Sequence, residues 1–487
     1  MSQHLPLEQL AKRTFRAGAQ MVVSVIVVAL TTLTAPDTAS AIVCNASSFS
    51  CPPTGTCIIT GTWDIGDGCA LDFGTQSIEL RGTLQAATTS GAFLITAGSV
   101  ALKAGKLKSL GTLSEPGGDI TVRATGLFSM EGSGPRIETS GTAGGGTIEV
   151  TAASLSLSTG LIVSEGGTGA TCGDAGDISL KANAGPVTLA STIRANTGGS
   201  DCDGGSIRLS GTSVTISGDI DARGGSSASD EAIVIDSQSG DLLIANGAFL
   251  RADGTGQPDG EGASGGRIAL LSGGNATVNG TISATGNAPD AVAGGVSIAA
   301  NGNATIGGPI NLSGFGTGAG GDLVVVAGGT LQASAELRTN GGSVYPGGRG
   351  GTIQLRASGS LAVSSDILSS AADGGGVVLV GSPASLTGHI TAKGARGSGG
   401  HVVIESCNAS ILGTIDTGAT LGGVSGSTSI SAGSISIQST ASILGQPCSA
   451  NSSCVTFRTV TGHLTISNEA ALSPTPIIAT DDTLPLC

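Results

Sequence analysis

The chain has 487 residues, 83 of them Gly, and only 11% of its residues are charged and 2% aromatic. Gly falls far short of one residue in three, which excludes a collagen-like chain, and a mean hydropathy of +0.30 argues against disorder. The net charge of −14 excludes the basic footprint of nucleic-acid-binding proteins, so no nucleic-acid partner is expected. With so few aromatic residues, the composition favours a fold that buries small and branched aliphatic side chains in thin layers.

Residues 1–41 have the features of a secretory signal peptide. A segment with three basic residues, 12–16, precedes a mostly apolar stretch, 21–33, and small residues at 39–41 offer a cleavage site. An uncleaved membrane anchor is the alternative interpretation. No later stretch is apolar for long enough to span a bilayer. The sequence therefore predicts an exported protein, secreted or held at the cell surface, with no membrane span after signal removal.

All ten cysteines follow this segment, and their even number suits disulfide bonds made in an oxidising compartment. They form an N-terminal group of four, a central pair and a C-terminal group of four, and pairing is expected within each group. Zinc binding is the alternative, but the gaps are wide and no His stands at ligand spacing. The groups are Cys44, Cys51, Cys57 and Cys69; Cys172 and Cys202; and Cys407, Cys448, Cys454 and Cys487.

Between the outer cysteine groups the sequence repeats itself every 28 residues or so. Each unit contains Gly-Gly-x-Ile-x-Leu-x-Ala, in which every second residue is aliphatic or small, as in a β-strand with one buried face. A weaker middle strand and a third strand follow in each unit. The Gly-Gly pairs are expected to turn the chain, since no helix or Gly-Lys-Ser/Thr follows them as in a phosphate-binding loop. The first aliphatic column contains Ile120, Ile148, Ile178, Ile207, Ile233, Ile268, Val296, Leu323, Ile353, Val377 and Val402.

Three short strands cannot enclose a core alone, but stacked units can bury one against the next. The repeat therefore predicts an all-β fold, a single-stranded parallel β-helix or β-solenoid of about 13 to 14 rungs over residues 78–440. Residues 42–77 are expected to form a cysteine-rich N-terminal cap, and residues 441–487 a cysteine-containing C-terminal cap or tail. Such caps would cover the unpaired strand edges at the two ends of the stack.

The repeat style resembles that of secreted bacterial β-helix proteins of the filamentous-haemagglutinin and autotransporter-passenger type. Gly204-Gly-Ser-Ile-Arg-Leu-Ser-Gly211, followed by Gly218-Asp-Ile-Asp-Ala-Arg-Gly224, carries the resemblance. It extends over residues 78–440 and implies a surface-exposed or released adhesin. The partners implied are glycans or proteins of a host or matrix.

The connection between the third strand and the next Gly-Gly pair varies freely in length and sequence, as in 253–262 and 340–348. In a stacked solenoid these Gly-rich loops project as a row from one edge, and loops on a rigid scaffold are where binding sites usually lie. An unselected spacer is the alternative. The sequence thus favours a structural or adhesive protein that binds through the loop row.

Four acidic residues flank the central cysteine pair: Asp174, Asp177, Asp201 and Asp203. Oxygen ligands on flexible loops are what Ca²⁺ prefers, so these residues are the candidate calcium ligands, with a solvated acidic turn as the alternative. No other cofactor is predicted.

Parallel β-helices also include polysaccharide lyases and glycoside hydrolases, which need carboxylates and basic groups on one outer sheet. Asp219, Asp221 and Arg223 alternate with inward-facing residues and are the candidate catalytic residues for that alternative function. A solvated strand face is the simpler interpretation, because no second acid is found at an equivalent position beside the Asp219 pair. Catalysis is therefore the second choice.

Overall fold

The computed structural model describes residues 42–167, 173–198, 202–224, 231–255, 263–344, 347–421, 423–445, 454–460 and 463–480. The candidate signal peptide, 1–41, lies outside these residues. All the described residues belong to one compact unit, Ala41–Cys487. Within the described residues, no helix has both the length and the apolar character that crossing a bilayer requires.

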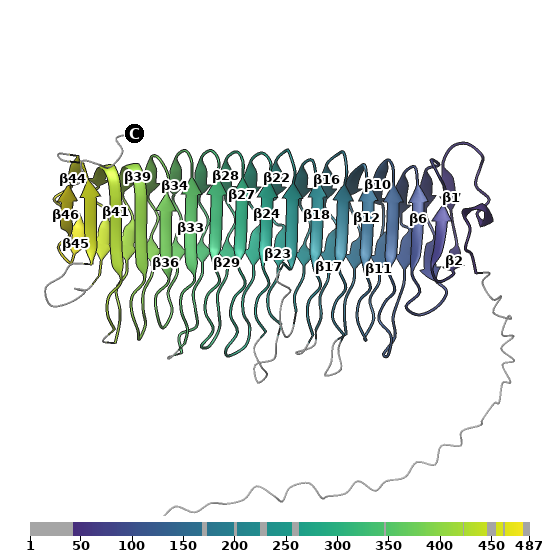
Figure 1. The fold of residues 1–487 in the computed structure, drawn as a ribbon, viewed down its shortest axis with the longest axis horizontal. Coiled ribbons are helices and arrows are strands. Elements are labelled where there is room, and N and C mark those ends of the chain that lie inside the picture. The colour runs from purple at the N-terminus through teal and green to yellow at the C-terminus, as the bar shows by residue number, and fades with distance from the viewer. Residues whose placement is uncertain are drawn as a thin grey trace, which may run out of the picture. The chain divides into compact units, whose positions relative to one another are not determined.

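The unit is a stack of short parallel strands, almost without helix, that winds through about 14 turns. Most turns contribute three strands, which we call the first, middle and third strand in the order of the repeat (Figure 1). The first strands are β3 (Cys69–Asp72), β6 (Phe93–Ala97), β9 (Ile120–Ala124), β12 (Ile148–Ala152), β15 (Ile178–Ala182), β18 (Ile207–Gly211), β21 (Ile233–Ser237), β24 (Ile268–Ser272), β27 (Val296–Ala300), β30 (Leu323–Ala327), β33 (Thr352–Ala357), β36 (Gly376–Val380), β43 (Val455–Thr459) and β46 (Ile477–Thr480).

The middle strands are β1 (Cys57–Ile59), β4 (Ile78–Leu80), β7 (Val100–Lys103), β10 (Leu127–Glu131), β13 (Ser154–Leu157), β16 (Val187–Leu189), β19 (Val214–Ile216), β22 (Leu242–Ile244), β25 (Ala276–Val278), β28 (Ala304–Ile306), β31 (Leu331–Ala333), β34 (Leu361–Val363), β37 (Ala384–Leu386) and β44 (Leu464–Ile466). In two late turns the first and middle strands merge into one long strand, β39 (His401–Ile411) and β41 (Ser427–Ile437).

The third strands form a separate sheet of 16 strands. They are β2 (Thr62–Ile65), β5 (Thr83–Ala86), β8 (Lys106–Lys108), β11 (Arg136–Glu138), β14 (Leu161–Val163), β17 (Thr192–Arg194), β20 (Ile220–Asp221), β23 (Phe249–Arg251), β26 (Thr281–Ser283), β29 (Ile310–Asn311), β32 (Leu337–Arg338), β35 (Ile367–Leu368), β38 (Ile390–Thr391), β40 (Thr414–Asp416), β42 (Ser442–Leu444) and β45 (Ala471–Ser473).

The core consists of aliphatic columns that run along the stack. Ile178 pairs in register with Ile207, and Ile207 with Ile233, and all three side chains are buried. Strands of neighbouring turns lie about 4.8 Å apart, so identical side chains pack directly on one another. The predicted parallel β-helix, with one aliphatic face on each strand, is confirmed.

Strand pairing extends beyond residues 78–440 at both ends. β1 pairs with β4 at the N-terminal end, and β43 pairs with β46 at the C-terminal end. A 3-10 helix, η1 (Ala46–Ser48), precedes the first paired turn. Next to it, Phe49 is buried against Trp63 and Phe73, with ring centroids 5.1 Å and 5.8 Å away. Three of the chain's ten aromatic side chains are thus used at this end of the core.

The N-terminal cysteines pair within their group, as Cys44–Cys69 and Cys51–Cys57. The Cys44–Cys69 bond joins the segment before η1 to the first strand β3. Three further cysteines, Cys202, Cys407 and Cys454, are also disulfide-bonded. Cys172, Cys448 and Cys487 lie outside the described residues, so the pairings predicted for the central and C-terminal groups stay predictions.

The Gly-Gly pairs are required by close packing between turns. A Cβ on Gly321 would lie 1.8 Å from the carbonyl oxygen of Gly294, and a Cβ on Gly351 would lie 1.9 Å from that of Gly321. None of these three residues has a positive φ, so it is space and not left-handed backbone that demands Gly here. The prediction that the pairs turn the chain stays a prediction, and the structure adds that they let the backbones of successive turns pack closely.

Candidate functional site

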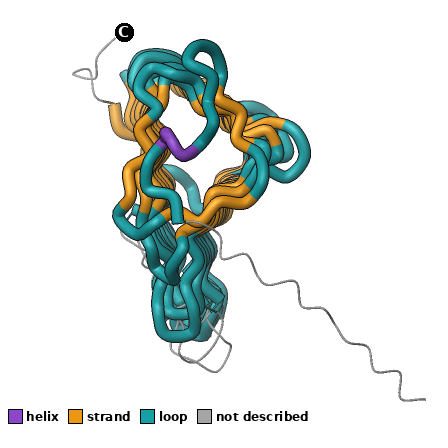
Figure 2. The backbone as a smooth tube through the Cα atoms, turned by 90° about the vertical axis from the view of Figure 1, so that its right-hand side faces the viewer, coloured by secondary structure: helices purple, strands orange, loops and turns teal. Residues whose placement is uncertain are grey.

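The loops between each third strand and the next first strand project from one edge of the solenoid (Figures 1 and 2). We call this row of loops the fin. The view along the stack in Figure 2 shows the loops overlying one another below the ring of strands. The described parts of the fin are 109–119, 139–147, 164–167, 173–177, 195–198, 202–206, 222–224, 252–255, 263–267, 284–295, 312–322, 339–344, 347–351, 369–375, 392–400, 417–421 and 423–426.

Backbone hydrogen bonds join the loops of successive turns. Gly286 N donates to Ser313 O at 3.1 Å, and Gly314 N donates to Asn340 O at 2.8 Å. Each loop is also closed at its base, for example by Gly321 N donating to Leu312 O at 2.9 Å. The fin is therefore a continuous extension of the scaffold, and its loops are held at the spacing of the turns.

Several loops of the fin expose large apolar side chains. Val292, Phe315 and Val344 lie on the loops of three successive turns and are 44%, 56% and 50% exposed. Leu113 and Leu421, on loops nearer the two ends, are more exposed still. Exposed apolar side chains gathered on one feature are characteristic of interaction surfaces.

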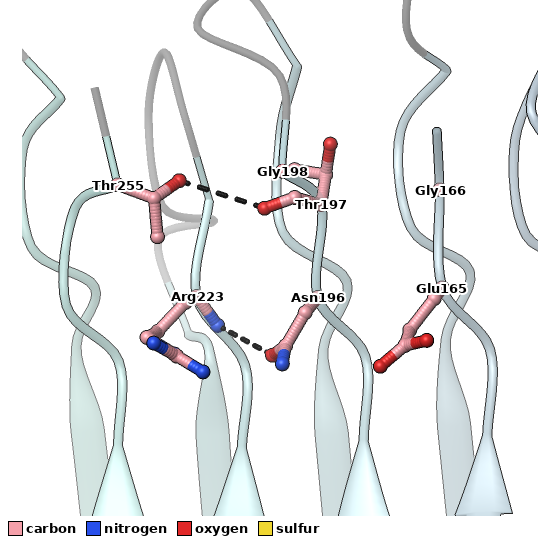
Figure 3. A pocket seen from close by; sticks show the side chains of 7 residues that line it. All are labelled: Glu165, Gly166, Asn196, Thr197, Gly198, Arg223 and Thr255. Atoms are coloured by element: carbon pink, nitrogen blue, oxygen red, sulfur yellow. Dashed lines mark hydrogen bonds between the residues drawn. The ribbon is translucent and has the colours of Figure 1, made fainter. Parts of the chain in front are cut away.

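A pocket of about 260 Å³ opens at the base of the fin, where it meets the outer face of the third strands. Three of its polar side chains come from equivalent positions, three residues after the buried Ile of β14, β17 and β20. Figure 3 shows Glu165, Asn196 and Arg223 at one level on three neighbouring turns, with Asn196 in the middle. The lining residues are Glu165, Gly166, Asn196, Thr197, Gly198, Arg223 and Thr255.

Hydrogen bonds between turns fix the geometry of this pocket. Arg223 N donates to Asn196 Oδ1 at 3.0 Å, which positions the amide. Thr197 Oγ1 donates to Gly167 O at 3.2 Å, and Thr255 Oγ1 donates to Thr197 O at 3.5 Å. Both hydroxyl hydrogens are therefore engaged within the protein.

Asp221 and Arg223 form a two-point ion pair beside the pocket. Arg223 Nε donates to Asp221 Oδ1 at 2.7 Å and Nη2 donates to Oδ2 at 2.6 Å. The Asp221 side chain is only 5% exposed, and its bond to Arg223 raises the pKa of that guanidinium. Both carboxylate oxygens of Asp221 are thus held by one guanidinium, which orients Arg223 at the pocket wall.

Glu165 is the acidic side chain that lines the pocket, and it is half-buried. Burial raises the pKa of Glu165, Arg194 and Arg136 oppose that shift, and the negative charges of Asp221 and Glu138 add to it. Within the described part of the chain its carboxylate has no hydrogen-bond donor or ion-pair partner. The pocket therefore contains a half-buried acidic group with no direct partner among the described residues.

The three candidate catalytic residues do not all lie on a solvated strand face, as the simpler interpretation expected. Asp221 is buried and Arg223 is paired with it, while Asp219 Oδ1 accepts a hydrogen bond from Phe249 N at 3.2 Å. The solvated interpretation is wrong for Asp221, because the side chain is buried and held by Arg223. Both acids are engaged in holding neighbouring groups, and only Arg223 lines the pocket.

The side chains of two candidate calcium ligands accept hydrogen bonds from backbone N–H groups of the next turn. Asp174 Oδ1 accepts from Asp203 N at 2.8 Å, and Asp177 Oδ1 accepts from both N and Oγ of Ser206, at 2.9 and 2.8 Å. Asp201 lies outside the described residues. In the ranges that the structure describes, no three His, Cys, Asp or Glu side chains come together as a metal site. The calcium prediction therefore gains no support here.

Reasoning from the sequence missed Glu165 and Asn196. The sequence does contain a pattern that could have located them. In successive units, the residues that stand three positions after the inward aliphatic residue of the third strand form a column on the outside of the solenoid. From β11 to β23 the members of this column are Ser140, Glu165, Asn196, Arg223 and Asp253, all polar, whereas the members after β5 and β8 are Ala87 and Leu110. Aligning the units on the third strand as well as the first would have brought these residues together.

Comparison with models of known families, with curated proteins and with solved structures finds no match to this chain. The solenoid architecture that the repeat implied is present, but no family match supports the resemblance to haemagglutinins and autotransporter passengers. The function must therefore be argued from the fin and the pocket at its base.

Proposed function

We propose that this chain is a secreted or cell-surface solenoid that binds an extended partner, a glycan or matrix protein, along the fin and at the pocket at its base. The observation that carries the proposal is the hydrogen bonding between loops of successive turns, such as Gly286 to Ser313 and Gly314 to Asn340. A surface ordered in this way loses little conformational entropy when it binds a long ligand, which favours affinity.

The export part of the proposal is supported by two features. The N-terminal segment 1–41 has the composition of a signal peptide, and disulfide bonds such as Cys44–Cys69 persist in oxidising compartments. Only 11% of the residues are charged, and the fin exposes apolar side chains. Both features suit contact with a partner outside the cell.

Binding accounts for the pocket better than hydrolysis does. Glycoside hydrolysis by the common route needs two carboxyl groups flanking the scissile bond. The described lining of the pocket has one, Glu165, while both oxygens of the neighbouring Asp221 are held by Arg223. Asp219 is engaged by the backbone of Phe249. These contacts favour a binding site over a two-carboxylate catalytic centre.

The test is retention of the full chain, recovered in its oxidised form, on arrays of glycans and matrix proteins. We expect retention on at least one class of surface, and loss of retention in the triple variant Val292→Ser, Phe315→Ser, Val344→Ser, which removes the apolar groups of three neighbouring loops. The control is Leu271→Ser with Val326→Ser, two side chains of similar exposure, 41% and 42%, on the outer face of the first strands. Absence of retention, or equal loss in both variants, would refute the proposal.

A further inference from the structure

Two columns of side chains run along the outer face of the first strands from β15 to the start of β39. The upstream column lies between the two buried aliphatic residues of each strand, and the downstream column follows the second of them. The upstream column is Ser179, Arg208, Val234, Ala269, Ser297, Val324, Gln354, Val378 and Val403, and the downstream column is Lys181, Ser210, Asp236, Leu271, Ala299, Val326, Arg356, Val380 and Glu405.

The centre of the downstream column is apolar and open to solvent. Leu271 and Val326 are 41% and 42% exposed, and Ala299, which pairs in register with both, is also exposed. Neighbouring aliphatic side chains on one outer sheet face are characteristic of an interaction surface. The feature is local, because the same outer positions of β9 and β12 hold the polar residues Thr121, Arg123, Glu149 and Thr151.

The downstream column complements itself about Ala299. One turn away on the two sides lie Leu271 and Val326, both apolar. Two turns away lie Asp236 and Arg356, which carry opposite charges. A two-fold rotation about an axis that passes Ala299 along the strands reverses the order of the turns and keeps the columns in place. Such a rotation places Leu271 of one copy opposite Val326 of another, and Asp236 opposite Arg356.

The match continues to the ends of the two columns. Four turns from Ala299 lie Lys181 on one side and Glu405 on the other, so the same rotation brings a second base onto a second acid. Within the part of the chain that the structure describes, the side chains of Lys181, Asp236, Arg356 and Glu405 have no ion-pair or hydrogen-bond partner. Each would gain a partner of opposite charge from a second copy.

Other placements of a second copy lose this match. Moving the axis by half a turn toward β30 would set Leu271 opposite Arg356, and moving it by a whole turn would set Asp236 opposite Glu405. An axis parallel to the stack would exchange the two columns, so that Asp236 would meet the upstream Val234 of its own turn. Like charges, or a charge against an apolar side chain, disfavour each of these arrangements.

We propose that the chain forms a symmetric dimer through this face, with the two-fold axis along the strands at Ala299. A two-fold interface requires a surface that complements itself, which the downstream column provides. The face measures about 40 Å by about 16 Å, from turns about 4.8 Å apart and residues about 3.3 Å apart. Two such faces bury about 1,300 Å² together, inside the range of about 1,200 to 2,000 Å² for specific interfaces.

The symmetry also fixes the direction of the two fins. The first strands run away from the fin (Figure 1), and a rotation about an axis along the strands keeps that direction. Both fins therefore project from the same edge of the dimer, while the two stacks run in opposite directions. The inference does not depend on what the fin binds, but two fins on one edge would give an extended partner two sites and raise avidity.

Sedimentation velocity of the full oxidised chain at about 1 to 100 µM measures the dimer, which we expect to form in this range. Arg356→Glu sets two acids against each other at both symmetry-related places, and Asp236→Lys sets two bases against each other. Each variant alone should weaken the dimer about a hundredfold or more. The matched control is Lys106→Glu, the same change of charge at an exposed position of β8 in the third-strand sheet, which should leave the dimer unchanged.

The decisive sample is an equimolar mixture of Arg356→Glu and Asp236→Lys. In a mixed pair the introduced glutamate meets the introduced lysine, and the unchanged Asp236 of one copy meets the unchanged Arg356 of the other. The mixture should therefore recover the dimer although neither variant forms it alone. No variant has to be compared across a change in folding, because the recovery uses the same two chains.

Three results would overturn the inference. A parent chain that stays monomeric at about 100 µM would leave this face to a different partner. Dimerisation that both single variants retain would place the contact on another face, and a mixture that stays monomeric would exclude the two-fold arrangement. The array test of the fin remains separate when it is made below the concentration at which the parent dimerises, because its control variant changes Leu271 and Val326.

Discussion

Arg223 holds both carboxylate oxygens of Asp221, two residues before it in the chain, through contacts of 2.7 and 2.6 Å. The pair lies at the junction of the third strands and the fin, where Asp221 is 5% and Arg223 39% exposed. Because Arg223 N also donates to Asn196, the pair connects the strand β20 to the turn before it. It is thus both a structural contact and the support of one pocket wall.

Replacing Asp221 should therefore weaken the junction locally. We expect Asp221→Asn to destabilise it by about 2 kcal/mol, since a hydrogen bond to a charged group contributes about 1.5 to 3 kcal/mol. In a solenoid each turn contacts only its neighbours, so the loss should appear as faster amide exchange in β17, β20 and β23. Asp219→Asn is the control, because its oxygen still accepts from Phe249 N. Unchanged exchange in Asp221→Asn would contradict the role assigned to the pair.

The Gly-Gly pairs allow a comparison between adjacent residues. A Cβ on Gly294 would lie 1.9 Å from Gly266 O, whereas the nearest atom to a Cβ on Gly295 is Asp322 O at 3.4 Å. We expect Gly294→Ala to destabilise the fold by about 1 to 3 kcal/mol, the usual effect of overpacking. Gly295→Ala should change stability by less than about 1 kcal/mol, and in the stabilising direction, because Ala restricts the unfolded chain. Denaturant unfolding of both variants measures the two changes in stability. Equal changes would exclude the packing explanation.

The sequence predicted the core well because burial there is governed by a local pattern. An inward position in a solenoid accepts little besides an aliphatic or small side chain, so the columns of Ile178 and Ile207 recur visibly in every unit. The glycine pairs were equally visible in the sequence, but the physical reason why Gly is required there was not. It depends on how closely Gly294 approaches the backbone of the preceding turn, a distance that the sequence alone does not reveal.

The pocket could not be predicted in the same way. Its members, Glu165, Asn196 and Arg223, differ in type and charge, so the column that they share is visible only when the units are aligned on the third strand. That alignment does not show that the three side chains line one pocket. Asp221 was recognised as a candidate, but its burial depends on how Arg223 is oriented against it, which is a tertiary feature. Sequence patterns thus locate the scaffold better than the contacts made upon it.

The two N-terminal disulfides should differ in their contribution to stability. Cys44–Cys69 spans 25 residues and Cys51–Cys57 spans 6. In the chain-entropy model the longer loop constrains the unfolded state more, by about 1 kcal/mol for these lengths. We expect the double variant Cys44→Ala, Cys69→Ala to be less stable than Cys51→Ala, Cys57→Ala by that amount, measured by denaturant unfolding under oxidising conditions. The reverse order would show that native packing near Phe49, and not loop length, sets the difference.

The raised pKa of Glu165 predicts a pH dependence of stability with a definite sign. Burial raises the pKa in the folded state, so between the unfolded and folded pKa values the native chain holds more protons than the unfolded chain. Stability therefore falls as the pH rises through that interval, and above it the ionised Glu165 leaves the fold less stable than a neutral residue would. Glu165→Gln should be more stable than the parent chain at pH 7, and the difference should vanish below the ordinary pKa of Glu.

Chemical unfolding at pH 4 and pH 7 tests this, with Glu131→Gln as the exposed control that should show no such pH-dependent gain. A Glu165→Gln variant that is less stable at pH 7 would mean that Arg194 and Arg136 compensate the carboxylate fully.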